Sequence, residues 1–157
     1  MSTLAALRPD EWDFPLFLHV LGAIVLFGAV ASAVVLESAS FSRAAPAAAL
    51  LRRLAFRTTL IAVWPAFILM RVAAEWIRSK EFPGEAPEPD WVGVGYIIGD
   101  GGVLVLLALT LCTWLAARQT KTDRPRPATV PIATGLAGLY LVALAVAWFA
   151  MTAKPGG

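Results

Sequence analysis

Four long apolar runs dominate this sequence and limit what it can fold into. They cover residues 14–36, 58–77, 91–115 and 131–151. Each has about the 20 residues that an α-helix needs to cross some 30 Å of hydrocarbon. Inside a bilayer each backbone polar group must be bonded within its own segment, which isolated runs achieve only as helices. The sequence therefore predicts four transmembrane helices.

The composition agrees with this class of protein and leaves no room for a soluble domain. Hydrophobic residues make up 59% of the chain, against roughly half in soluble domains. We predict an all-α, four-helix transmembrane bundle in which residues 1–157 form a single integral membrane domain in contact with the lipid bilayer. The formal net charge of +2 gives no support to nucleic-acid binding.

The flank of the first run argues against a cleaved signal peptide. Asp10, Glu11 and Asp13 outnumber Arg8 there, whereas a signal peptide has a basic leader and a shorter apolar core. We therefore expect a permanent helix, although residues 31–33 have the small side chains of a cleavage site.

Basic residues predict the orientation of the chain. The connections 38–57 and 116–130 hold eight of them, and the opposite side holds four: Arg43, Arg52, Arg53, Arg57, Arg118, Lys121, Arg124 and Arg126 against Arg8, Arg78, Lys80 and Lys154. Cytoplasmic loops carry the excess of Lys and Arg. Both termini are then outside the cytoplasm, in a multi-pass protein of a bacterial inner membrane. Four tryptophans at the outer helix ends agree with this orientation: Trp12, Trp76, Trp91 and Trp148.

Two features around the second run affect its shape. Residues 47–57 have leucines at helical spacing beside arginines, which fits either a separate interfacial helix or an early start of the second transmembrane helix. Pro65 lacks a backbone N–H, so we expect a kink near Trp64-Pro65 that frees carbonyl groups.

Four polar side chains lie inside the predicted spans, where they are costly and often mark a site. They are His19, Arg71, Glu75 and Asp100. Arg71 and Asp100 each lie about 5 Å outward of the midplane, at 1.5 Å per residue. We predict a cross-helix ion pair between Arg71 and Asp100, with Glu75 and His19 one turn nearer the outer surface. Such a cluster can be a functional site or an ion pair that only fixes packing.

His19 is the single histidine of the chain. A neutral imidazole can bind a metal or haem iron, move a proton, or form a structural hydrogen bond, here to Glu75 or Asp100. Haem would need a second axial ligand such as Met70 or Met151, and copper(I) accepts the same thioethers. The candidate cofactor ligands are therefore His19, Met70 and Met151, with His19 as the metal ligand.

The first helix has the sequence Phe17-Leu18-His19-Val20-Leu21-Gly22-Ala23 and continues to Gly28. This HxxG turn resembles the opening helix of the CopD-type copper-resistance membrane domain, and equally a related group of four-helix predicted integral membrane proteins of bacteria. The resemblance implies an inner-membrane bundle that handles copper or haem at His19. Further histidines and a methionine-rich tract are missing from the sequence, which weighs against metal transport.

Two function classes remain open. In the first, His19 holds haem or copper and the polar cluster surrounds it. In the second, the chain is a non-catalytic accessory or structural subunit of a larger membrane complex or homo-oligomer. No nucleotide-binding loop, metalloprotease motif or nucleophile elbow is found in the sequence, so no enzymatic activity is assigned.

Overall fold

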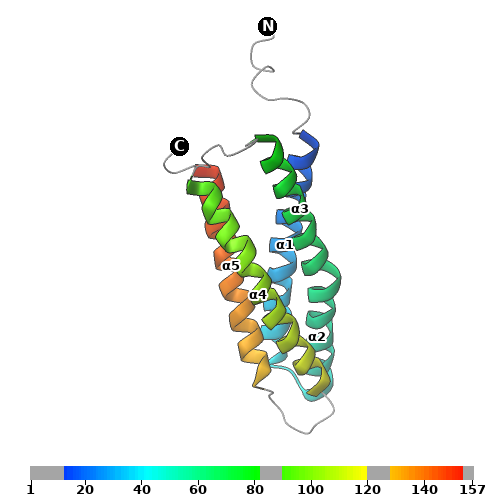
Figure 1. Ribbon diagram of the computed structural model, residues 1–157. Coiled ribbons are helices and arrows are strands. Elements are labelled where there is room, and N and C mark those ends of the chain that lie inside the picture. The colour runs from blue at the N-terminus through cyan, green and yellow to red at the C-terminus, as the bar shows by residue number, and fades with distance from the viewer. Residues whose placement is uncertain (1–12, 82–89, 120–127, 154–157) are drawn as a thin grey trace.

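The described residues of the chain form helices only. A computed structural model describes residues 13–81, 90–119 and 128–153. The helices are α1 (Asp13–Ser40), α2 (Ala45–Thr58), the π-helical turn η3 (Thr59–Val63), α3 (Trp64–Glu81), α4 (Asp90–Arg118) and α5 (Thr129–Ala153). Figure 1 shows them as one elongated bundle.

The four predicted membrane helices are confirmed. Four helical segments are long and apolar enough to cross a membrane: Asp13–Ser40, Ala45–Lys80, Trp91–Arg118 and Thr129–Ala153. The predicted runs 14–36, 58–77, 91–115 and 131–151 each lie inside one of them. Every observed helix extends beyond its apolar run, because backbone hydrogen bonding continues where side chains no longer need to be apolar.

The early start of the second membrane helix is the correct interpretation of residues 47–57. The backbone stays in the right-handed helical region at Thr58 and Thr59, where α2 passes into η3. No separate interfacial helix forms. The continuous segment has 36 residues, or about 54 Å at 1.5 Å per residue, which exceeds the thickness of the hydrocarbon core.

A π-helical turn marks the region of Trp64-Pro65. The N–H of Trp64 donates to the carbonyl of Thr59, five residues earlier. Pro65 has no N–H for the carbonyl of Ile61, four residues before it, so the regular hydrogen-bond pattern is interrupted at this point. The irregularity predicted from Pro65 is thus present as a wide turn within a continuous helix.

Different helix ends lie at the two ends of the bundle. The start of α1, the end of α3, the start of α4 and the end of α5 lie together at what we call the terminal end (Figure 1). The opposite end, here the basic end, holds the turn between α1 and α2 and the helix ends that flank residues 119–128. Chain order alternates between the two ends, as expected for four antiparallel spans.

The apolar core lies in the middle of the bundle. α1 packs against α2, α3 and α5, and α4 packs against α5 and α2. The buried residues at the centre come from all of these partners except α2: Leu26, Ala29, Val30, Val63, Ala66, Phe67, Leu106, Leu109, Ala133, Ala137 and Tyr140. Gly102 lets Tyr140 approach α4, since a Cβ there would lie 2.6 Å from the tyrosine oxygen.

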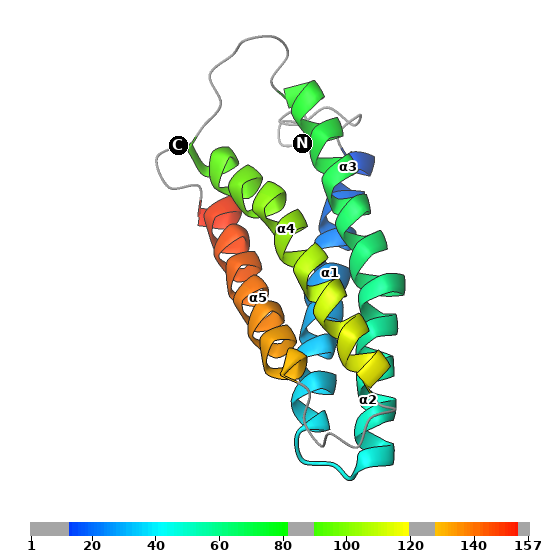
Figure 2. The same cartoon turned by 60° about the horizontal axis from the view of Figure 1, so that its bottom comes forward.

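Side chains, rather than close backbone packing, bridge α3 and α4. The indole Nε1 of Trp64 donates to Oγ1 of Thr110 at 2.9 Å, and Arg71 reaches Asp100 nearer the terminal end. Figures 1 and 2 both show the α1–α3 pair apart from the α4–α5 pair at the terminal end and near it at the basic end. Long polar side chains therefore connect α3 to α4 in the terminal half.

Candidate functional site

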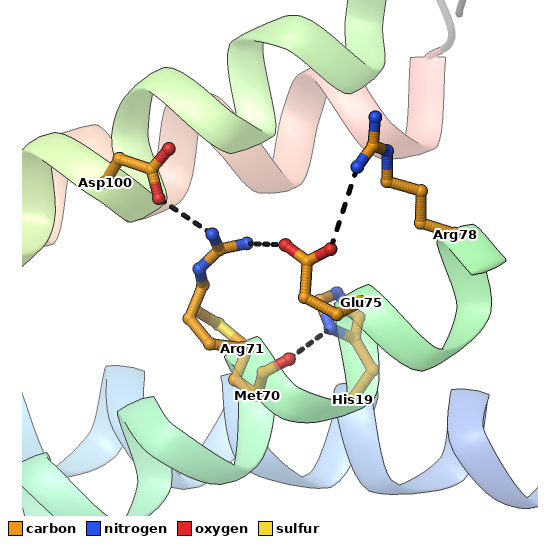
Figure 3. Close-up of polar contacts among 6 residues, drawn as sticks. All are labelled: His19, Met70, Arg71, Glu75, Arg78 and Asp100. Atoms are coloured by element: carbon orange, nitrogen blue, oxygen red, sulfur yellow. Dashed lines mark hydrogen bonds and ion pairs between the residues drawn. The ribbon is translucent and has the colours of Figure 1, made fainter. Parts of the chain in front are cut away.

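His19 binds the backbone of α3. Its Nδ1 lies 3.0 Å from the carbonyl oxygen of Met70, and Figure 3 shows the ring directed toward that group. The carbonyl can only accept, so Nδ1 is the donor in this hydrogen bond. The predicted bond to Glu75 or Asp100 is thus replaced by one to a main-chain oxygen.

Gly22, one turn after His19, meets the same residue of α3. A Cβ added to Gly22 would lie 2.8 Å from the backbone nitrogen of Met70 and 3.0 Å from its Cα. Only a glycine permits this approach, since no backbone atom of α3 can move aside alone. The HxxG turn is therefore a docking motif in which the histidine bonds to α3 and the glycine lets α3 come close.

Arg71 lies at the centre of a network that joins α3 to α4. Its Nη2 lies 2.7 Å from Oδ1 of Asp100, and its Nη1 lies 3.1 Å from Oε1 of Glu75. The second oxygen of Glu75 lies 3.9 Å from Arg78. Figure 3 shows the Arg71 guanidinium between the two carboxylates. The cross-helix pair predicted from depth alone is present, and one arginine serves both acids.

Two residues of α4 accommodate the Arg71 side chain. The guanidinium carbon lies 4.9 Å from the ring centroid of Tyr96, and that of Arg78 lies 5.4 Å from the same ring. Gly99 leaves space for the stem, because a Cβ there would lie 3.3 Å from Cδ of Arg71. These contacts hold the arginine between α3 and α4, with Gly99 as the glycine of α4 that meets it. We call Arg71, Glu75, Arg78 and Asp100 the terminal network.

The terminal network lies deep along the helices yet stays exposed on the surface of the chain. Asp100 and Arg71 are each ten residues from the terminal ends of their helices (100 − 90 and 81 − 71), or about 15 Å along the axis. The side chain of Asp100 is nevertheless 65% exposed. In a bilayer this face must meet water or protein, because an ionised group in contact with lipid is costly.

The candidate cofactor ligands lie on different helix pairs. Met70 adjoins His19 on the α1–α3 side. The methyl carbon of Met151 lies against Gly95, on the α4–α5 side. Within the described ranges, no three His, Cys, Asp or Glu side chains gather as a metal site would need. The structure thus places His19 with Met70 and gives no contact that joins Met151 to them.

The sequence analysis missed two buried charged residues at the basic end. Glu37 of α1 is 0% exposed and Arg52 of α2 is 5% exposed. Glu37 directly follows the predicted run 14–36, and Arg52 lies in the connection 38–57 that the sequence predicts to be cytoplasmic. A signal was present, because Glu37 continues the helical spacing of the buried α1 positions Leu26, Val30 and Ala33.

Comparison with known proteins adds no family to this description. No protein-family model, no curated protein sequence and no solved structure matches the chain.

Proposed function

We propose that this multi-pass membrane protein is a non-catalytic subunit that associates with a partner through the face between α3 and α4. Four apolar helices establish its place in a membrane. The HxxG turn is fully used in docking α1 to α3, and Arg71 is satisfied by two carboxylates within the chain. This arrangement stabilises a bundle and presents a polar face.

The observation that carries the proposal is the exposure of Asp100. The 29 residues of α4 span about 43 Å, which puts Asp100 about 6 Å from the middle of the helix. A carboxylate that is 65% exposed at this depth is stabilised when a polar surface covers it. A neighbouring transmembrane helix with Lys, Arg, Asn, Ser or Thr side chains would supply the hydrogen-bond donors.

Photo-crosslinking tests the association. A photoreactive amino acid at Ile97, which is 75% exposed and one turn from Asp100, should capture a protein partner in the membrane. The matched control is Leu139 of α5, which is 63% exposed and should capture lipid only. The mass of the adduct distinguishes a second copy of the chain from a different subunit. Equal protein capture from both positions, or none from Ile97, contradicts the proposal.

Cofactor binding at His19 is the second candidate. It is favoured by the hydrogen bond from Nδ1 to the Met70 carbonyl, because ligating histidines are commonly oriented by such a bond while Nε2 holds the metal. His19 and the Met70 thioether would hold copper(I) or haem iron. The resemblance of the HxxG helix to the CopD-type domain supports the same ligand.

A visible spectrum and a metal analysis of the purified protein separate the two candidates. A Soret band or one equivalent of copper that is lost in His19→Leu would favour the cofactor. Gly28→Ala is the control, because nothing lies within 4 Å of a Cβ at that position. If the protein is colourless and metal-free after growth with added haem and copper, cofactor binding is contradicted and association remains the proposed function.

For location, we propose a bacterial inner membrane with both termini outside the cytoplasm. The support is the sequence distribution of basic residues, eight in the connections 38–57 and 116–130 against four on the opposite side. Single cysteines at Glu85 and Gly156, in a Cys112→Ser background, should react with an impermeant reagent in whole cells. A cysteine at Thr122 should react only after lysis. If the cysteine at position 122 reacted in intact cells, the orientation would be the reverse of the one proposed.

A further inference from the structure

Glu37 is a fully buried acid whose carboxyl group has no hydrogen bond in the described part of the chain. Neither oxygen finds a partner among the described residues. The buried hydroxyls of Ser40, Thr59 and Thr113 each donate to a carbonyl of their own helix, at 2.8, 3.0 and 3.1 Å. Arg52 Nε and the hydroxyl of Thr129 in this half also have no hydrogen bond among the described residues, but Glu37 is the buried carboxyl in which both oxygens lack one.

The ionisable groups that face Glu37 come from two neighbouring helices. Arg52 of α2 and Cys112 of α4 lie within electrostatic range of the carboxyl. η3, which also packs on α1, has no ionisable side chain, and α5 has only Tyr140. The side chains of Arg53 and Arg57 on α2 are exposed. One positive charge therefore faces one carboxyl inside the bundle.

Two opposing effects act on a carboxyl in this position. Burial without hydrogen bonds disfavours the ionised form, whereas the guanidinium of Arg52 favours it. Neither effect is removed by solvent, because Glu37 is fully enclosed. Carboxyl groups inside membrane helix bundles form proton relays in pumps and transporters.

We propose that Glu37 is a proton-binding site and that Arg52 is the counter-ion of its ionised form. The ligand is a proton rather than a metal ion, since a proton needs one carboxyl oxygen and no set of ligands. Glu37 is three residues from the basic end of α1 (40 − 37), or about 4.5 Å along the axis. A proton therefore crosses only about one helical turn to reach it from that aqueous side.

Infrared difference spectroscopy of the full-length protein in lipid vesicles tests this proposal directly. The carbonyl stretch of a protonated carboxylic acid should be present at low pH and should disappear between about pH 5 and about pH 9. The isosteric change Glu37→Gln should abolish this band. The matched control Glu75→Gln removes an exposed, ion-paired carboxylate and should leave it unchanged.

Labelling supplies a second readout on the unmodified chain. Dicyclohexylcarbodiimide, an apolar reagent that attacks protonated carboxyl groups, should modify Glu37 at low pH and lose this reaction as the pH rises. Arg52→Gln should shift both the band and the labelling to higher pH. The proposal is overturned if no band titrates, if the band survives in Glu37→Gln, or if Glu37 resists labelling at every pH.

Discussion

The two halves of the bundle hold their charged residues in opposite ways. In the terminal half, Arg71 contacts two carboxylates at 2.7 and 3.1 Å, and those carboxylates stay exposed. In the basic half, Glu37 is enclosed and its carboxyl group forms no hydrogen bond with the described residues. A membrane bundle can therefore accommodate an acidic side chain in two ways. It can pair the ionised group with an arginine at the surface or, as we propose for Glu37, bury the group in its protonated form.

The difference follows from how closely the helices approach each other. At the terminal end the α3 and α4 backbones are separated, so long side chains such as Arg71 fill the space and meet (Figure 2). At the basic end α2 packs on both α1 and α4. These close contacts enclose Glu37 in a place where its carboxyl group has no hydrogen-bond donor among the described residues. Four predictions test this contrast, in order of decreasing expected effect.

Removing the central arginine should have the largest effect on stability. Arg71→Leu leaves Asp100 without its partner, and we expect the free energy of unfolding to fall by about 3 kcal/mol. The double change with Asp100→Leu should recover much of this loss, since it removes both charges. Unfolding by SDS in mixed micelles measures all four members of the cycle. If the single losses simply add, the pair is not coupled.

Gly22→Ala should weaken the docking of α1 on α3. The added methyl group would lie 2.8 Å from the Met70 nitrogen, and overpacking against backbone costs about 2 kcal/mol. Gly28→Ala on the same helix meets no atom within 4 Å and is the matched control. Thermal unfolding in detergent compares the two. Equal melting temperatures would show that the HxxG glycine is not needed for close packing.

Neutral replacements of the two carboxylates should differ in their cost. Asp100→Asn loses a charge-assisted hydrogen bond to Arg71, and we expect a loss of about 1.5 kcal/mol. Glu37→Gln at mildly acidic pH replaces a protonated acid by its isostere, so the change should stay within about 0.5 kcal/mol. The same SDS titration measures both. A larger loss in Glu37→Gln would mean that Glu37 is ionised and paired at that pH.

A small loss of stability is expected at His19. In His19→Leu the Met70 carbonyl no longer accepts a hydrogen bond from the imidazole. It can still accept the regular helical hydrogen bond from the backbone N–H four residues later in α3. Interhelical hydrogen bonds in membranes contribute about 0.6 kcal/mol on average, and we expect a loss of that size. SDS unfolding measures it in protein prepared without haem or copper. A loss several times larger would give His19 a structural role beyond this bond.

The helices could be predicted because their length and apolarity are set by the bilayer itself. Their ends could not, as residues 45–57 show. Leucines beside arginines fit a helix lying on the membrane as well as one that rises out of it. The choice depends on whether Thr58 and Thr59 continue the helix, and on packing of α2 against α1 and α4 that sequence spacing does not contain.

Some contacts of the polar residues could likewise be predicted from the sequence, and others could not. Arg71 and Asp100 could be matched by depth, because each charged group in the membrane needs a partner at its own level. The partner of His19 could not, since a main-chain carbonyl occurs at every residue and only the rotation of α3 selects Met70. Glu37 was missed because the end of a membrane helix usually faces water. Its enclosure depends on α2 lying beside it.

The unbroken passage from α2 through η3 into α3 has a mechanical consequence. The hydrogen bonding of this continuous helix is least regular between Thr59 and Val63, so bending of the helix is expected there. The arm formed by the 14 residues of α2 is about 21 Å long, so a tilt of about 10° at η3 moves its far end by about 4 Å. A displacement of α2 at the basic end would thus be taken up at η3, between α2 and the part of α3 that holds Arg71.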